Sequence, residues 1–172
     1  LGAHVLKVER PGRGDETREW GPPFDDRGAS AYYLAVNRNK LSIAADFKRD
    51  GELIRRLASE AEVVVENFLP GALERGGISA KSLLATNPKL IWCTITGFGA
   101  ESSRPGYDFV AEAESGWMFI TGEPKGEPMK AGVALADVLA GKDAAIAILG
   151  ALAGQGRGVA VQRHIVISLL DS

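Results

Sequence analysis

Asp137 is the residue whose type and position most directly suggest covalent chemistry. It stands just before a stretch rich in Ala, Ile and Leu, and this stretch predicts a helix over residues 138–153. Aspartate is a preferred N-cap residue, and from spacing alone its role would be to stabilise the start of this helix by roughly 1 kcal/mol. An aspartate carboxylate is also a nucleophile in covalent catalysis, and the positive end of a helix dipole favours its ionised form. The two roles can coexist.

A second candidate segment is polar and cationic. Asn37, Arg38, Asn39 and Lys40 place two amides and two cations directly before a predicted strand at residues 41–45. Arginine and lysine neutralise phosphate, while asparagine both donates and accepts, so the segment suits a ligand with a phosphorylated ribose. From spacing alone, an Asn-rich turn before the strand is the better interpretation.

Asn67 and Phe68 follow the apolar run at residues 63–65, which is typical of a buried parallel strand. In open α/β sheets, ligands bind beyond the carboxyl ends of the strands. An amide and an aromatic ring at such a place suit contacts to adenine or pantetheine. A turn whose phenylalanine packs inward explains the same residues equally well.

Glu9 and Arg10 end the first predicted strand, residues 4–9, and open a long loop over residues 10–29. An acid at a strand end can bind a ribose hydroxyl in a dinucleotide fold, but the glycine fingerprint that should precede it would lie before this segment. A solvated loop of mixed charge is therefore the better interpretation of the spacing. Long loops in compact domains are nevertheless usually functional.

Short apolar strands alternate with helical patterns along the chain. This alternation predicts an α/β fold with a Rossmann-like open parallel sheet and helices on both faces. A mobile surface loop is expected at residues 154–163. The predicted strands are residues 4–9, 41–45, 62–66, 90–96 and 161–169, and the predicted helices are residues 30–36, 48–59, 79–86, 107–119 and 138–153, with one further turn at residues 72–75.

Composition excludes several classes of function. The net charge is −2, with 20 basic and 22 acidic residues, so we expect no binding to nucleic acid or to an anionic membrane. No apolar run reaches the length of a transmembrane helix. His4 and His164 lack partners at metal-ligand spacing, so no metal site is expected. The single cysteine, Cys93, reads as a small buried hydrophobe and fits a reducing compartment such as the cytoplasm.

Several motifs follow one another in a distinctive order. They are Gly-Ala-His-Val-Leu-Lys-Val-Glu-Arg-Pro-Gly-Arg-Gly-Asp, Asn-Arg-Asn-Lys-Leu-Ser-Ile, Val-Val-Val-Glu-Asn-Phe-Leu-Pro-Gly-Ala-Leu-Glu-Arg, Thr-Gly-Phe-Gly, Arg-Pro-Gly-Tyr-Asp, Thr-Gly-Glu-Pro and Ser-Leu-Leu-Asp. With them, the chain resembles the class III coenzyme A transferases, the CaiB/BaiF family, from residue 1 to residue 172.

The resemblance implies an open α/β large domain, a smaller domain, and two chains that interlock as a homodimer. Family members are commonly about twice as long, so residues 1–172 are expected to form a single partial large domain. The first strand and helix, the small domain and the return of the chain are expected to be missing. The chain does not begin with Met, which fits a truncated N-terminus.

The resemblance also assigns roles to the candidate residues. Asp137 matches the nucleophile, which forms an aspartyl anhydride and then an aspartyl-CoA thioester. The substrates are an acyl-CoA and a carboxylic acid, and no tightly bound cofactor is implied. Tyr107 and Asp108 match positions near the thioester, and the residues that match CoA contacts are Arg10, Asn37, Arg38, Asn39, Lys40, Asn67, Phe68 and Arg75.

Two alternatives stay open beside the transferase. Racemases of the same family use a histidine in a Gly-His-Asp motif, whereas this chain has Gly106-Tyr107-Asp108. Tyrosine is a poor base near neutral pH because its unperturbed pKa is about 10, so the transferase ranks first. A partial domain could instead bind CoA or self-associate without catalysis. An NAD-dependent oxidoreductase is disfavoured by the missing glycine fingerprint.

Overall fold

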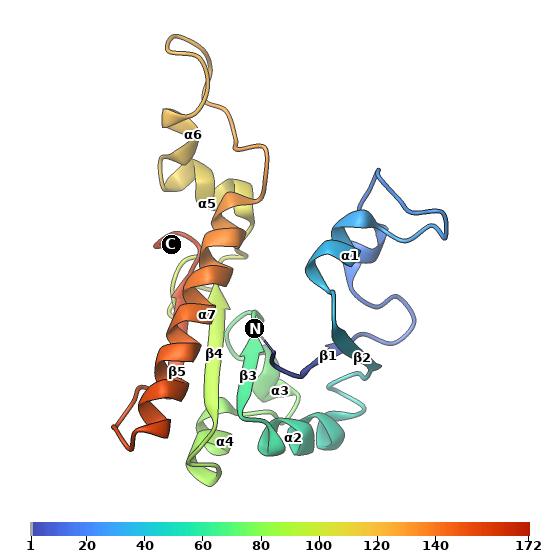
Figure 1. Ribbon diagram of the computed structural model, residues 1–172, viewed down its shortest axis with the longest axis vertical. Coiled ribbons are helices and arrows are strands. Elements are labelled where there is room, and N and C mark those ends of the chain that lie inside the picture. Colours follow the sequence, from blue (N-terminus) through green and yellow to red (C-terminus); the bar gives the residue numbers. More distant parts are fainter. Residues whose placement is uncertain (1) are drawn as a thin grey trace. The chain divides into compact units, whose positions relative to one another are not determined.

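The computed structural model describes residues 2–172, which form two compact units, one running to Ile54 and the other starting at Arg55. All paired strands run parallel, and helices connect them, as Figure 1 shows. The predicted α/β fold with parallel strands is confirmed. Each unit has its own sheet, and the assignment of residues 1–172 to a single partial domain stays a prediction.

The first unit is a strand–helix–strand crossover. Its two strands pair from Val5 with Lys40 to Glu9 with Ala44. Ser30 caps the connecting helix as predicted, because its hydroxyl accepts a hydrogen bond from the amide of Tyr33. The elements are β1 (Val5–Glu9), the 3₁₀ helix η1 (Glu16–Glu19), α1 (Ala31–Val36), β2 (Lys40–Ala44) and α2 (Gly51–Glu60), which contains the boundary between the units.

Glu9 anchors the long loop of this unit. Its side chain is 4% exposed, and its two oxygens accept five hydrogen bonds. The donors are the Arg18 guanidinium at 2.8 and 2.9 Å, the Ser42 hydroxyl at 2.7 Å, the Asp15 amide at 2.9 Å and the Tyr33 hydroxyl at 3.0 Å. The predicted solvated loop is therefore wrong at this residue. These five hydrogen bonds occupy both oxygens of Glu9, so the side chain is not available to bind a ribose. Instead, this buried carboxylate connects the loop to β2 and α1.

The same network predicts an acid-dependent stability. The Arg18 guanidinium and the other donors hold the pKa of Glu9 well below its usual range. Since its folded-state pKa lies below the unfolded value of about 4.3, the network stabilises the fold fully above that pH. This contribution is lost as the pH falls further.

Glu9→Gln is therefore expected to lower the free energy of unfolding by about 2 kcal/mol at pH 7 and to flatten its dependence on acid. Denaturant titrations at several pH values measure both effects. Glu62→Gln removes an exposed carboxylate and serves as the control. Equal acid dependence in the two variants would rule out the proposed stabilisation by the Glu9 network.

The second unit holds a three-stranded parallel sheet in the order β3-β4-β5. Ser79 caps α4 as predicted, through the amide of Ser82. The elements are β3 (Val63–Glu66), α3 (Ala72–Arg75), α4 (Ala80–Thr86), β4 (Ile91–Thr96), α5 (Asp108–Glu114), α6 (Trp117–Ile120), α7 (Leu135–Gly156) and β5 (His164–Ser168).

Helix α7 covers one face of this sheet and builds the core there (Figure 1). Ile91, Cys93 and Ile165 pack against Ala144 and Ala151, whose small side chains let the helix approach the strands closely. Cys93 is fully buried, and this burial raises the pKa of its thiol, so its predicted role as a core residue is confirmed.

A second cluster joins α5 to α7. Ala111 of α5 packs against Ala136 and Ala140 of α7 and against Leu169. All four side chains are buried. This contact brings the first turn of α5 to the first turn of α7, which positions the site described below.

Two expectations about element boundaries and one about burial were wrong. The long helix α7 begins at Leu135 rather than at residue 138 and runs to Gly156, so part of the expected loop at residues 154–163 is helical. The helix expected over residues 107–119 is two helices, because Gly116 lies between them with φ 91°, in the left-handed region. The third concerns the run at residues 63–65, which was expected to be buried: Val65 is 53% exposed, and β3 is an edge strand of the sheet.

Across residues 2–172, no helix combines the length and the apolar character that crossing a membrane requires. The same residues contain no group of three or more His, Cys, Asp or Glu side chains that could hold a metal ion.

Candidate active site

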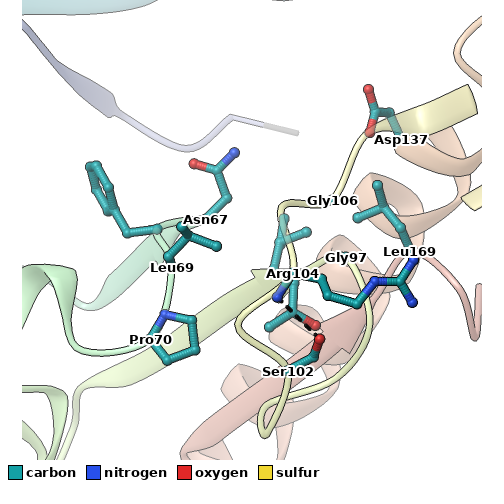
Figure 2. A pocket seen from close by; sticks show the side chains of 12 residues that line it. Asn67, Leu69, Pro70, Gly97, Ser102, Arg104, Gly106, Asp137 and Leu169 are labelled. Carbon is teal, nitrogen blue, oxygen red and sulfur yellow. Dashed lines mark hydrogen bonds between the residues drawn. The ribbon is translucent and has the colours of Figure 1, made fainter. Parts of the chain in front are cut away.

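The carboxyl ends of β3, β4 and β5 surround two adjoining hollows of about 100 and 300 Å³. Four residues line both of them: Asn67 after β3, Ile95 near the end of β4, Leu169 after β5, and Asp137 on α7. Figure 2 shows the Asn67 carboxamide and the Asp137 carboxylate on two sides of the opening. The parallel sheet thus brings together two residues that lie 70 positions apart, as the rule for strand ends predicts.

Asp137 is the third residue of α7, so its predicted role as the N-cap is wrong. The N-cap position is Ala134, which provides no side-chain hydrogen bond. Within residues 2–172, the Asp137 carboxylate accepts no hydrogen bond from another residue. Its oxygens are therefore free for chemistry at the wall of the hollow.

The surroundings tune the charge of Asp137. Partial loss of hydration and the nearby carboxyl of Asp108 raise the pKa of Asp137. The positive end of α7 acts in the opposite direction and favours the ionised form.

Two carboxyl groups of α5 supply the missing cap of α7. Asp108 accepts a hydrogen bond from the amide of Asp137 at 3.1 Å and another from the amide of Ala136. Glu112, which is fully buried, accepts from the amides of Leu135 at 3.4 Å and Ala131 at 2.8 Å. The start of α7 is therefore fixed by tertiary contacts rather than by its own sequence.

The floor of the smaller hollow is a close approach of two backbone segments. A Cβ atom built on Gly97 would lie 2.3 Å from the Cα of Gly106, and one built on Gly106 would lie 2.3 Å from the Cα of Gly97. Both glycines line this hollow. Only residues without side chains allow this approach, so the two glycines set the depth of the hollow.

Arg104 lines the same hollow but has structural partners. Its guanidinium lies 3.9 Å from the centre of the Phe98 ring and forms a bidentate ion pair with Glu114. These contacts tie the loop before α5 to that helix. Sequence reasoning missed Arg104, Ser102 and Leu169 as lining residues, although Arg104 and Leu169 belong to the Arg-Pro-Gly-Tyr-Asp and Ser-Leu-Leu-Asp motifs.

Of the other predicted site residues in the second unit, Phe68 lines a hollow, whereas Arg75 and Tyr107 do not. Phe68 lines the smaller hollow with Asn67. Arg75 is exposed on α3 and is not among the residues that line either hollow. Tyr107 is 60% exposed and stacks with Phe109 at 6.1 Å between ring centroids. Its neighbour Gly106 lines the smaller hollow, and its neighbour Asp108 accepts a hydrogen bond from the Asp137 amide.

The first unit gathers a cationic cluster of its own. The Asn37 carboxamide oxygen accepts from the ammonium groups of Lys7 at 3.0 Å and Lys40 at 3.2 Å. Burial and the charge of Lys7 lower the pKa of Lys40. Lys7 is also paired with the carboxylate of Asp15, so Lys40 carries the positive charge of this cluster that suits an anion such as a phosphate. Sequence reasoning missed Lys7, which reads as an ordinary polar residue of an alternating strand.

The remaining candidates of this unit are exposed, namely Arg10, Arg38 and Asn39. Asn39 has φ 63°, in the left-handed region that asparagine tolerates better than most residues. The predicted turn before the strand therefore explains Asn39 by backbone conformation.

Comparisons with known proteins agree on one family. The family model described as "CoA-transferase family III" matches residues 1–172. The chain is 48% identical to the succinate–glutarate CoA-transferase of Agrobacterium fabrum and 44% identical to the human succinyl-CoA:glutarate CoA-transferase, over 99% and 98% of this chain. A CaiB/BaiF family protein from Brucella suis has a similar structure, with a TM-score of 0.91 and 50% identity over 99% of this chain.

These relatives are longer than the chain described above. The matches cover 45% and 40% of the two transferases and 47% of the Brucella suis protein. The chain thus spans less than half of their length.

Proposed function

Because the chain belongs to CoA-transferase family III, we propose that the protein carrying it transfers coenzyme A between an acyl-CoA and a carboxylic acid, with Asp137 as the nucleophile. One observation carries this proposal. The Asp137 carboxylate stands at the carboxyl ends of three parallel strands, at the wall of a hollow, without a hydrogen-bond partner among residues 2–172. By contrast, the carboxylates of Glu9 and Glu112 are engaged in hydrogen bonds that hold the structure together.

The proposed reaction begins with attack of an Asp137 oxygen on the thioester carbonyl carbon. The carbon–sulfur bond breaks, which gives a mixed anhydride and CoA thiolate. The thiolate then attacks the aspartyl carbonyl carbon, releases the first carboxylic acid as its carboxylate, and forms an aspartyl-CoA thioester. The acceptor carboxylate repeats the two steps in reverse, and Asp137 is regenerated.

Each tetrahedral intermediate needs a hydrogen-bond donor for its oxyanion. The amides of Leu135, Ala136 and Asp137 are bonded to carboxyl groups of α5, so the first turn of α7 does not provide one. We assign this role to the Asn67 carboxamide, which lines both hollows with Asp137.

The cationic cluster is proposed to bind the phosphates of CoA. Its ammonium groups come from Lys7, which is paired with Asp15, and from Lys40, and the exposed side chains of Arg10, Arg38 and Asn39 belong to the same unit. Phe68 and Arg75 are proposed to contact other parts of the CoA molecule. The family resemblance further leads us to propose a homodimer that works in the cytoplasm without a tightly bound cofactor.

The names of the relatives suggest the class of acid. Both transferases reported above are named for succinate or succinyl-CoA and glutarate, so we propose short dicarboxylic acids as substrates. The racemase alternative has less support, because these relatives are transferases and Tyr107 stands in place of the histidine base.

Trapping of the intermediate tests the proposal. The full-length protein is incubated with succinyl-CoA and then with hydroxylamine, which converts an activated carboxyl group into a hydroxamate. Peptide mass spectrometry is expected to find the hydroxamate on Asp137 and not on Asp143, an exposed carboxylate of the same helix. An unmodified Asp137 in a protein that transfers CoA to glutarate would contradict the covalent mechanism.

A further inference from the structure

Helix α7 contains four glycines, although glycine is an unfavourable residue inside a helix. Two of them have a structural explanation. A Cβ atom on Gly154 would lie 2.4 Å from Cγ1 of Val161, and Gly156 is the last residue of the helix. At Gly141 and Gly150, a Cβ atom would meet no atom of residues 2–172 within 4 Å. Packing within these residues therefore does not require glycine at either position.

Gly141 differs from Gly150 in what it borders. Gly141 lines the larger hollow, whereas Gly150 is not among the described residues that line either one. Gly141 stands four residues after Asp137, so the two lie one turn apart on the same side of α7, and both line this hollow. A side chain at position 141 would therefore take up space at the wall of the hollow, beside the Asp137 carboxylate.

The lining of the larger hollow indicates which kind of group fits there. Both charged residues in it, Glu66 and Asp137, are acids, and no lysine or arginine of residues 2–172 lines it. Two acids at a partly desolvated site repel a second anion, so the hollow suits an uncharged chain rather than a free carboxylate or a phosphate. The rest of the wall is apolar and is formed by Val65, Ile95, Ala140, Gly141 and Leu169.

We propose that Gly141 keeps the larger hollow open for an uncharged chain that flanks the thioester group, and that a side chain at this position blocks the approach of an acyl-CoA to Asp137. Two chains of this chemistry flank the thioester, namely the pantetheine end of CoA and the methylene chain of the acyl group. The identity of the ligand rests on the proposed function. The open space at Gly141 stands on the geometry of α7 and the hollow.

Gly141→Val and its matched control Gly150→Val, both in the full-length protein, test this inference. Valine is tolerated in a helix at least as well as glycine, so both variants are expected to fold. One extra methylene in a binding pocket changes discrimination by roughly 10–200-fold. Gly141→Val is therefore expected to lower kcat/KM for succinyl-CoA by at least about tenfold, whereas Gly150→Val should keep the wild-type value.

Gly141→Ala separates a blocked hollow from a damaged fold. Since alanine is the better helix former, this variant is expected to unfold at a higher denaturant concentration than the wild type, as Gly150→Ala should. Its kcat/KM for succinyl-CoA is nevertheless expected to fall, by a smaller factor than in Gly141→Val. Damage to α7 would lower stability and activity together.

Calorimetry identifies the chain that occupies the hollow and needs no turnover. The probes are CoA and adenosine 3′,5′-bisphosphate, which lacks the pantetheine chain. Weaker binding of CoA by Gly141→Val, with unchanged binding of the bisphosphate, would assign the hollow to pantetheine. Unchanged binding of CoA, with a lowered kcat/KM for succinyl-CoA, would assign it to the acyl chain. An equal loss of affinity for both probes would show that the effect is not local, which overturns the inference.

These results also separate the inference from the proposed function. If Gly141→Val binds CoA more weakly but the wild-type protein transfers no CoA, the hollow holds CoA as inferred and the proposed function fails. If Gly141→Val matches Gly150→Val in both binding and turnover, the inference is wrong. Should Gly141→Val fail to fold, Gly141→Ala still decides, because wild-type kcat/KM and CoA affinity in that variant would overturn the role of Gly141.

Discussion

Replacing Asp137 with asparagine is expected to lower the rate of CoA transfer by on the order of a thousandfold or more, since the reaction would lose its nucleophile. The change is nearly isosteric, and the amide of residue 137 still donates to Asp108. Because the carboxylate itself has no partner within residues 2–172, the free energy of unfolding should hardly change. Transfer from succinyl-CoA to glutarate measures the rate, and denaturant titration measures the stability.

Asp143→Asn is the matched control, because it removes a carboxylate from an exposed position of the same helix. Asp137→Ala guards against slow deamidation of the introduced asparagine, which would restore the wild-type residue. Full transfer activity in Asp137→Ala would end the covalent proposal. Equal loss in Asp143→Asn would point to damage of α7 rather than to lost chemistry.

Gly97→Ala is expected to destabilise the second unit by about 3 kcal/mol. The added methyl group would lie 2.3 Å from the Cα of Gly106, and neither backbone segment can move without deforming the end of β4. The floor of the smaller hollow would be displaced with it, so binding of CoA should weaken too. Thermal or denaturant unfolding and calorimetry with CoA measure the two effects.

Gly150→Ala is the control for this change. Gly150 lies inside α7, and a Cβ atom there would meet no neighbouring atom within 4 Å. Since alanine is the better helix former, this variant is expected to gain about 0.5–1 kcal/mol of stability. A Gly97→Ala variant as stable as the wild type would mean that the two loop segments do not approach each other as described.

Much of the second unit could be predicted from the sequence. The apolar runs at residues 63–65 and 90–96 become β3 and β4, and Ser79 caps a helix as its type suggests. Because parallel strands end at one edge of the sheet, the rule for ligand sites predicts Asn67 and Asp137 near one another, and both line the same two hollows. These features depend on local pattern and on one topological rule.

The start of α7 could not be predicted, for a physical reason. Ala134 gives no capping signal, because the hydrogen-bond acceptors come from Asp108 and Glu112 on another helix. In the sequence, Glu112 reads as a surface acid of an amphipathic helix. Its burial depends on how α5 packs against α7, and no periodicity reports that.

Lys7 illustrates the same limit in the first unit. Its place in an alternating strand predicts a solvated side chain, yet it lies beside Asn37 and Lys40. The parallel register that pairs Lys7 with Ser42 creates this proximity. This register pairs residues that lie 35 positions apart, so it cannot be read from the local sequence pattern.

The capping contacts that α5 makes with the first turn of α7 also have a consequence for the order in which the two helices form. The first turn is the costly step in forming a helix, and the first turn of α7 has no local residue to satisfy its amides. We therefore expect it to become ordered only when α5 has docked. Transient detachment of α5 would therefore unwind the turn that carries Asp137 and expose its amides to exchange with solvent, while the rest of α7 stays anchored on β4 and β5.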